Sequence, residues 1–260
     1  EIKIINQITK NKHELSNKIN NSKKPIIILG QSILNSTNGP YVFEELKSYL
    51  TGINKINENW NSLNILSTNA SAVGSYDLGI FSSNDSRNKT IEKIHDNQAE
   101  IVFLIGQDNF KINKNKEFVI YIGSHGDLGA DMADIILPGA AYTEQDGYFT
   151  NLEGKLQKAY KASYPPGDAK EDWQIFNELS LAIQGNSLFK NKEELLKTMQ
   201  EYLKEEHNNK FEVPAFDIKD ESILVEDIDY YYSNTIARAS KTMSECRYAR
   251  ANFKKTGTEG

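Results

Sequence analysis

The sequence predicts an α/β fold: a doubly wound, mostly parallel sheet with helices on both faces, followed by a helical and irregular C-terminal extension. Short, uncharged runs of β-branched and apolar residues recur along the chain, and helical or mixed stretches separate them. Such runs are typical of strands buried on both faces of a parallel sheet. Some of them end directly in glycine, for example at Gly30 and Gly106, as strands do where a doubly wound sheet turns into its loops.

The expected elements follow in chain order. Residues 1–20 carry isoleucines and a leucine near helical spacing, which indicates an amphipathic helix that ends before Pro25. A helix is expected at residues 41–50, and strands are expected at 26–30, 63–67, 101–106, 118–123 and 135–137. Asp168 with Glu171 is typical of a capping box and predicts that a helix begins there. These elements form the first predicted domain, residues 1–186.

The second predicted domain, residues 187–260, is an extension whose charge changes along its length. Residues 201–229 hold ten acidic residues against three lysines and include Pro214, so we expect an irregular segment. Residues 233–260 are basic and predict a terminal helix with one narrow apolar stripe, which needs a surface to pack on. Two interpretations stay open: the helix docks on a neighbouring protein part, or it folds back on its own domain.

Composition excludes several classes of protein. The 260-residue chain has a formal net charge of −6, which argues against a general nucleic-acid binder. Its single cysteine, Cys246, permits no intrachain disulfide, and a cluster held by four thiolates needs more cysteines than the chain has. No apolar run approaches the roughly 20 residues of a membrane-spanning helix. Because the chain begins at Glu1, we expect either a processed chain or a fragment of a longer one.

The most informative stretch runs from residue 122 to residue 173. It contains an ordered series of short elements: Ala133-Asp134, Leu137-Pro138, Glu144, Gly147, Asn151, Glu153-Gly154, Pro166-Gly167 and Asp172-Trp173. This series resembles the molybdopterin oxidoreductase superfamily, in which the same elements occur in the same order. Two further runs, SHGDLGA at 124–130 and PGAAYTE at 138–144, are closer to the large iron–sulfur subunit of respiratory complex I than to the catalytic enzymes.

The tail at residues 234–246, NTIARASKTMSEC, is similar to that of mitochondrial complex I subunits. The resemblance implies a structural part of the peripheral arm, on the matrix side of the mitochondrial inner membrane or the cytoplasmic face of a bacterial one. It implies no catalytic centre, metal or cofactor in this chain, with iron–sulfur clusters and FMN in partner subunits. The implied partners are the N-terminal iron–sulfur module of the same subunit, in one chain or split from it, and other arm subunits.

Two alternatives stay open beside this interpretation. One is a C-terminal fragment of a catalytic molybdopterin enzyme of the formate dehydrogenase type. The other is a free-standing nucleotide-binding module that uses the crevice of its sheet.

Five polar residues are candidates for the remnant of a ligand crevice: His125, Asp127, Asp134, Glu144 and Asn151. Asp127 and Asp134 are expected at the carboxyl ends of strands, where doubly wound sheets bind ligands. Gly123, Gly126 and Gly129 are expected to let the backbone approach closely and turn sharply. We expect all these residues to build turns and caps rather than to perform chemistry.

Overall fold

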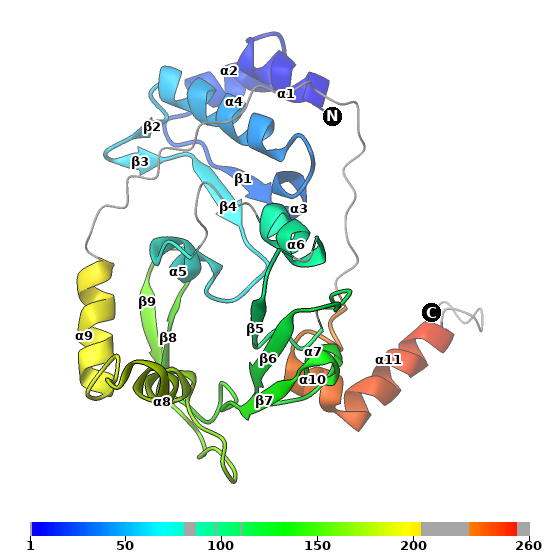
Figure 1. Ribbon diagram of the computed structural model, residues 1–260. Helices are drawn as coiled ribbons and strands as arrows, with labels where there is room; N and C mark the ends of the chain where they lie inside the picture. Colours follow the sequence, from blue (N-terminus) through cyan, green and yellow to red (C-terminus); the bar gives the residue numbers. More distant parts are fainter. Residues whose placement is uncertain (1, 81–86, 97, 110, 204–228, 254–260) are drawn as a thin grey trace. The chain divides into compact units, whose positions relative to one another are not determined.

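The computed structural model describes residues 2–80, 87–96, 98–109, 111–203 and 229–253 (Figure 1). Helices and parallel strands confirm the α/β class. The described chain forms two compact units, the first from residues 2–76 and 150–156 and the second from 77–149, 157–203 and 229–253. The predicted boundary after residue 186 stays a prediction.

The first unit is built on two parallel strands. β1 (Ile27–Gly30) pairs with β4 (Leu63–Leu66), and Ile27 lies opposite Leu63. The connection contains α3 (Gln31–Leu34) and α4 (Gly39–Gly52), followed by a short antiparallel pair, β2 (Ile56–Asn57) and β3 (Trp60–Asn61). The core of this unit lies between the sheet, α4 and α1, and consists of Ile8, Leu29, Val42, Leu46, Tyr49, Leu50 and Leu63.

The prediction of one N-terminal helix was wrong, because the segment forms two. α1 (Ile2–Thr9) and α2 (Glu14–Asn21) are separated by a turn in which Asn11 has a φ of 56°. His13 caps the second helix by accepting a hydrogen bond from the backbone nitrogen of Leu15 at 3.2 Å. The buried hydroxyl of Ser16 donates to the carbonyl of Ile8 at 2.8 Å and ties the two helices together.

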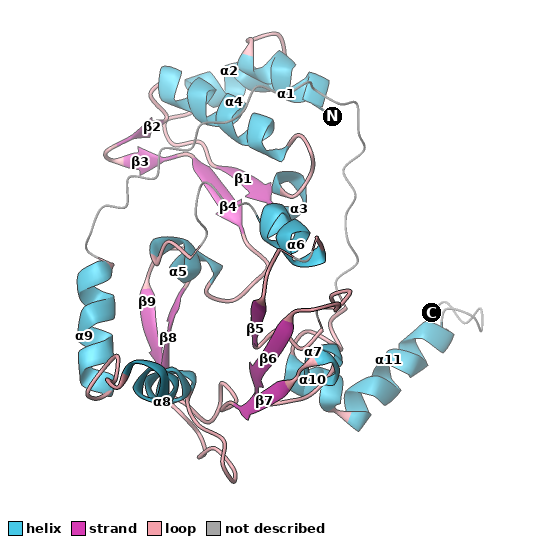
Figure 2. Cartoon of the chain, in the orientation of Figure 1, coloured by secondary structure: helices cyan, strands magenta, loops and turns pink. Residues whose placement is uncertain are grey.

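The second unit contains a three-stranded parallel sheet in the order β5 (Ile101–Ile105), β6 (Phe118–Gly123) and β7 (Ile135–Pro138), drawn as adjacent arrows in Figure 2. On one face α6 (Arg87–His95) and α7 (Leu128–Met132) contribute Ile94, Ala130 and Met132 to a core. The strand and loop residues of that core are Val102, Leu104, Ile112, Val119 and Tyr121.

Burial of these strands on their second face is partial among the described residues. Ile101 and Phe118, which lie opposite each other on the second face, remain 58% and 43% exposed. Burial alternates along β5, whereas Tyr121 and Ile122 are both buried in β6 and Ile135 and Ile136 are both exposed in β7. The apolar composition that predicted burial is present on both faces, and the described residues cover each face only in part.

The helix predicted to open at Asp168 begins four residues later, as α8 (Asp172–Gln184). Glu171 and Gln174 make the capping box, and Gly185 ends the helix with a φ of 77°. The start is delayed because Lys170 continues the sheet: its nitrogen donates to the Pro138 carbonyl at 3.1 Å.

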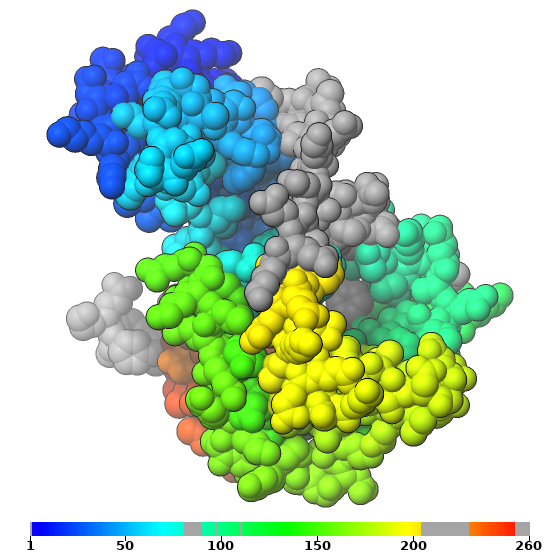
Figure 3. All heavy atoms as spheres, turned by 90° about the vertical axis from the view of Figure 1, so that its left-hand side faces the viewer, coloured from blue at the N-terminus to red at the C-terminus, as the bar shows by residue number. Residues whose placement is uncertain are grey.

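The remaining elements are peripheral. β8 (Gly147–Thr150) and β9 (Leu156–Ala159) form a hairpin, and α5 (Ala72–Asp77) is a short helix. α9 (Lys192–Tyr202) lies at the surface of the second unit (Figure 3), where Lys192 pairs with Glu171. α10 (Thr235–Ala239) and α11 (Lys241–Phe253) form the C-terminal tail, and α11 extends away from the sheet (Figure 1).

The close approach expected at the three glycines is confirmed at two of them. A Cβ at Gly129 would lie 2.4 Å from the Gln107 carbonyl oxygen, and one at Gly123 would lie 2.4 Å from the Tyr121 hydroxyl. At Gly126 the nearest atom is the Cβ of Ala130, at 3.3 Å, and φ is not positive. The tight contacts are therefore on either side of Gly126.

Replacing Gly129 with alanine should lower the free energy of unfolding by about 1–3 kcal/mol, because the clash is with backbone that has to shift. Gly126→Ala is the matched control and should cost clearly less, since only a side-chain methyl is near. Chemical denaturation of both variants measures the difference. Equal losses would show that the approach of α7 to the loop after β5 is not tightly packed.

Candidate functional site

Charged residues meet where β5 and β6 end in the second unit. Asp108 follows β5, and its side chain is only 3% exposed. It forms an ion pair with the guanidinium of Arg238, which α10 supplies from the C-terminal tail. Asp127, after β6, lies on the other side, with Oδ2 3.8 Å from the Arg238 Nε. We call Asp108, Asp127 and Arg238 the Arg238 cluster.

The cluster places one basic side chain between two acidic ones. The hydrogen bond to Asp108 raises the pKa of Arg238 against the opposing effect of burial. The guanidinium also donates to the Tyr232 carbonyl at 3.4 Å. Its Nε is buried without a hydrogen-bond partner among the described residues, so Asp127 acts on it only through charge. Burial raises the pKa of Tyr121, whose hydroxyl donates to the His125 carbonyl beside the cluster.

Local backbone contacts hold these side chains in place. Asp127 caps α7 by accepting from the Leu128 nitrogen at 2.9 Å, a typical use of an aspartate at a helix start. The Gly129 nitrogen donates to the Asp108 carbonyl at 2.8 Å, so the loops after β5 and β6 are joined. His125 contacts the Ser124 hydroxyl at 3.0 Å through Nδ1. The structure thus brings His125 and Asp127 to the carboxyl edge, where the sequence placed them.

Asp134 lies at the opposite end of the sheet from the one expected. It precedes β7, and its Oδ2 accepts from the Val119 nitrogen at 2.8 Å near the start of β6. Its Oδ1 pairs with Lys114 at 2.6 Å, and this bond is the main reason why the pKa of Asp134 is lowered. The expected position was wrong because Asp134 leads into its strand rather than out of it.

The other two candidates close turns. Glu144 accepts from the Ala141 nitrogen at 2.9 Å in the loop after β7. Asn151 accepts from the backbone nitrogens of Glu153 at 3.0 Å and Lys155 at 2.9 Å in the β8–β9 hairpin. Neither the Glu144 carboxylate nor the Asn151 amide belongs to the Arg238 cluster. Any role of the five candidates in binding stays a prediction.

Sequence reasoning missed Asp108 and Arg238. They lie 130 residues apart in the chain, so spacing does not link them. One signal was present: Arg238 is a lone cation between the apolar Ile236 and Ala239 in the tail. Through this pair α10 folds back on its own unit, whereas docking of α11 on a neighbouring protein part stays a prediction.

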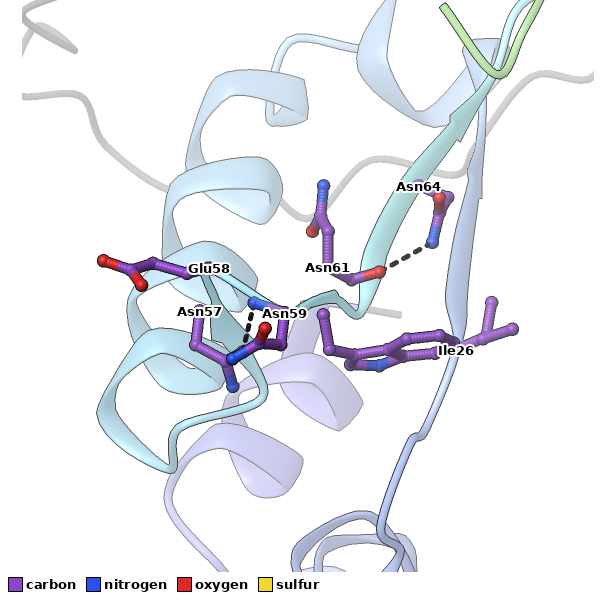
Figure 4. Close-up of a pocket in the computed structure, with 7 residues that line it drawn as sticks. Ile26, Asn57, Glu58, Asn59, Asn61 and Asn64 are labelled. Atoms are coloured by element: carbon purple, nitrogen blue, oxygen red, sulfur yellow. Dashed lines mark hydrogen bonds between the residues drawn. The ribbon is translucent and has the colours of Figure 1, made fainter.

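A separate hollow of about 420 Å³ lies in the first unit (Figure 4). It is lined by Ile26, Asn57, Glu58, Asn59, Trp60, Asn61 and Asn64. The asparagine amides already serve the local turns, for example where the Asn57 Oδ1 accepts from the Asn59 nitrogen at 2.9 Å. One carboxylate among amides offers no pair for acid–base chemistry.

Two further classes of site have no support in the described part of the chain. Its histidines, cysteine and carboxylates form no group of three placed to hold a metal ion. Among the same residues, no helix has the length and apolar character needed to cross a membrane.

Comparison with known proteins identifies the family. Residues 2–182 match the molybdopterin oxidoreductase family, and the chain belongs to it. It is 34% identical over 260 residues to the NADH-ubiquinone oxidoreductase 75 kDa subunit of Reclinomonas americana, a match covering 95% of this chain and 37% of that relative. It is 35% identical over 268 residues to an NADH-quinone oxidoreductase subunit of Rickettsia bellii, covering 99% of this chain and 38% of the relative. The chain spans less than two fifths of these relatives.

Catalytic proteins that the sequence resembles hold a pterin–guanine dinucleotide, and the carboxyl edge of β5 and β6 does not suit the phosphates of such a ligand. Such a ligand carries anionic phosphates, which need free cations or unoccupied backbone donors. At the carboxyl edge of β5 and β6, Arg238 is already paired with Asp108 and faces Asp127. Asp127 also occupies the Leu128 nitrogen at the start of α7. A phosphate placed there would meet two carboxylates.

Replacing Arg238 with leucine should lower the free energy of unfolding by about 3–5 kcal/mol, because the Asp108 carboxylate would be left buried without its partner. Denaturant unfolding measures the loss. Arg247→Leu is the matched control: its pair with Asp229 at 2.5 Å is half exposed, so the loss should stay below about 1 kcal/mol. The double variant Asp108→Asn with Arg238→Leu should recover part of the loss. If the two variants lost equal unfolding free energy, the tail would not be part of the core of the unit.

The pH dependence of stability should reveal the contribution of the Asp134 carboxylate to folding. Because its folded-state pKa is lowered, its contribution is present above the ordinary carboxyl pKa of about 3.9 and is lost as pH falls through the lower folded value. The stability difference between the wild type and Asp134→Asn should therefore shrink as the solution is acidified below that point. Lys114→Gln should weaken this dependence, since it removes the main cause. A difference that grows with acidification would contradict the assigned ion pair.

Proposed function

We propose that this chain is a structural, non-catalytic part of the peripheral arm of a respiratory NADH–quinone oxidoreductase, where it supports the iron–sulfur electron-transfer module between NADH and quinone. The observation that carries the proposal is the occupation of the carboxyl edge by the chain's own Arg238. A family member that fills its ligand edge with an internal ion pair keeps the fold and loses the site. Similarity to respiratory subunits along 95–99% of the chain supplies the context.

The proposal includes partners, cofactors and place. The partner is the iron–sulfur-binding remainder of the subunit, as one polypeptide or a separate chain, together with other subunits of the arm. Iron–sulfur clusters and FMN belong to those partners, and this chain holds neither, in keeping with its single cysteine. The arm lies on the matrix side of the mitochondrial inner membrane, or on the cytoplasmic face of a bacterial one.

Purification of the native protein tests this function. We expect it to co-purify with subunits of an NADH–quinone oxidoreductase, in a complex that contains iron. The chain produced alone should carry no stoichiometric molybdenum, tungsten or iron in elemental analysis. Near-stoichiometric molybdenum or tungsten would instead favour a catalytic fragment. Tight binding of a nucleotide by the isolated chain, measured by calorimetry, would favour a nucleotide-binding module.

A further inference from the structure

The second unit exposes an apolar sheet face that a solvated protein does not leave open. Ile101 is 58% exposed, Phe103 40%, Phe118 43% and Ile135 44%. The register joins them into one surface, because Ile101 lies opposite Phe118 and Ile120 lies opposite Ile135. We call this surface the open face; its exposed side chains are Ile101, Phe103, Ile105, Phe118 and Ile135, and Ile120 and Leu137 on it are half-buried.

The chemistry of the open face indicates burial in the assembled protein. All its side chains are aliphatic or aromatic, so it has none of the polar residues that alternate along a strand with one wet face. It also lacks the charges with which natural proteins protect exposed strands from association. Contiguous apolar surface of this kind marks an interaction site in a soluble assembly.

Helix α8 already covers part of this face, which shows that a helix can pack on it. The ring of Phe176 from α8 lies 6.5 Å from the ring of Phe103, and Ile122 near the carboxyl ends is fully buried. In β5 the exposed fraction is 45% at Ile105, 40% at Phe103 beside the Phe176 ring, and 58% at Ile101 at the amino end. Three strands about 4.8 Å apart span roughly 10 Å between the outer two, which is about the diameter of one helix. A single further helix has the width to cover the rest.

We propose that an amphipathic helix from the remainder of the same subunit packs on the open face, beside α8. The relatives supply that remainder, because the match covers only 37–38% of their length. The inference rests on the proposed function only in taking the occupant from the same complex. The apolar side chains of the docked helix would contact Ile101, Phe118 and Ile135, and its opposite face would be polar.

Thiol labelling in the assembled complex tests whether the face is covered. Ile101→Cys reports on the open face, and Asn113→Cys, exposed in the loop between β5 and β6, is the matched control; both carry Cys246→Ser. In the isolated chain a maleimide should label both positions quickly. In the complex, labelling at position 101 should slow at least tenfold relative to position 113. Equal protection at both positions, or protection at position 101 already in the isolated chain, would overturn the proposal.

Photo-crosslinking identifies the occupant. With p-benzoylphenylalanine in place of Phe118 in the assembled complex, mass spectrometry should find the crosslink in the part of the subunit outside this chain. A crosslink to a second copy, to lipid or to another subunit would overturn the assignment. If the chain fails to join the complex, the proposed function fails with it. If it joins and position 101 still labels as fast as position 113, only the docking fails.

Discussion

The second unit depends on the burial of the Asp108 carboxylate. A carboxylate at 3% exposure has lost most of its hydration, and a fixed positive charge beside it offsets part of that loss. Arg238 provides that charge from the far end of the chain, which orders α10 and directs where α11 begins. The Asp108 carbonyl at the same time receives the Gly129 nitrogen at 2.8 Å, so the loops after β5 and β6 meet there. One residue therefore joins two strand ends, a helix start and the tail.

Under the proposed structural role, this arrangement explains how the fold can persist without a ligand at the edge of its sheet. In a doubly wound sheet the strand ends need something to satisfy their donors and charges, and in enzymes the ligand does part of that work. Here Asp127 accepts a hydrogen bond from the first backbone nitrogen of α7, and Arg238 lies between the carboxylates of Asp108 and Asp127. Under that proposal the chain supplies these partners itself, and its stability does not depend on a bound ligand. The carboxyl edge then serves to hold the loops after β5 and β6 and helix α10 together.

Much of this was visible in the sequence, and the failures have physical reasons. The strands at 101–105 and 118–123 were predictable because β-branched runs end in glycine. The break between α1 and α2 was not, since one residue with positive φ and a histidine cap interrupt a continuous helical pattern. Asp134 was assigned to the wrong end of the sheet, because composition does not say whether a residue enters or leaves its strand. The Asp108–Arg238 pair joins residues too distant for any local pattern.

The open face also bears on how such a chain behaves when it is made. Apolar strands in contact with water favour any association that hides them, including association between copies. The stability of the isolated chain then becomes a function of its concentration, as in obligate oligomers. During synthesis the same surface is a target for chaperones until its cover arrives. For a protein of this kind, the order in which the parts of the complex are produced is thus a matter of solubility as well as of geometry.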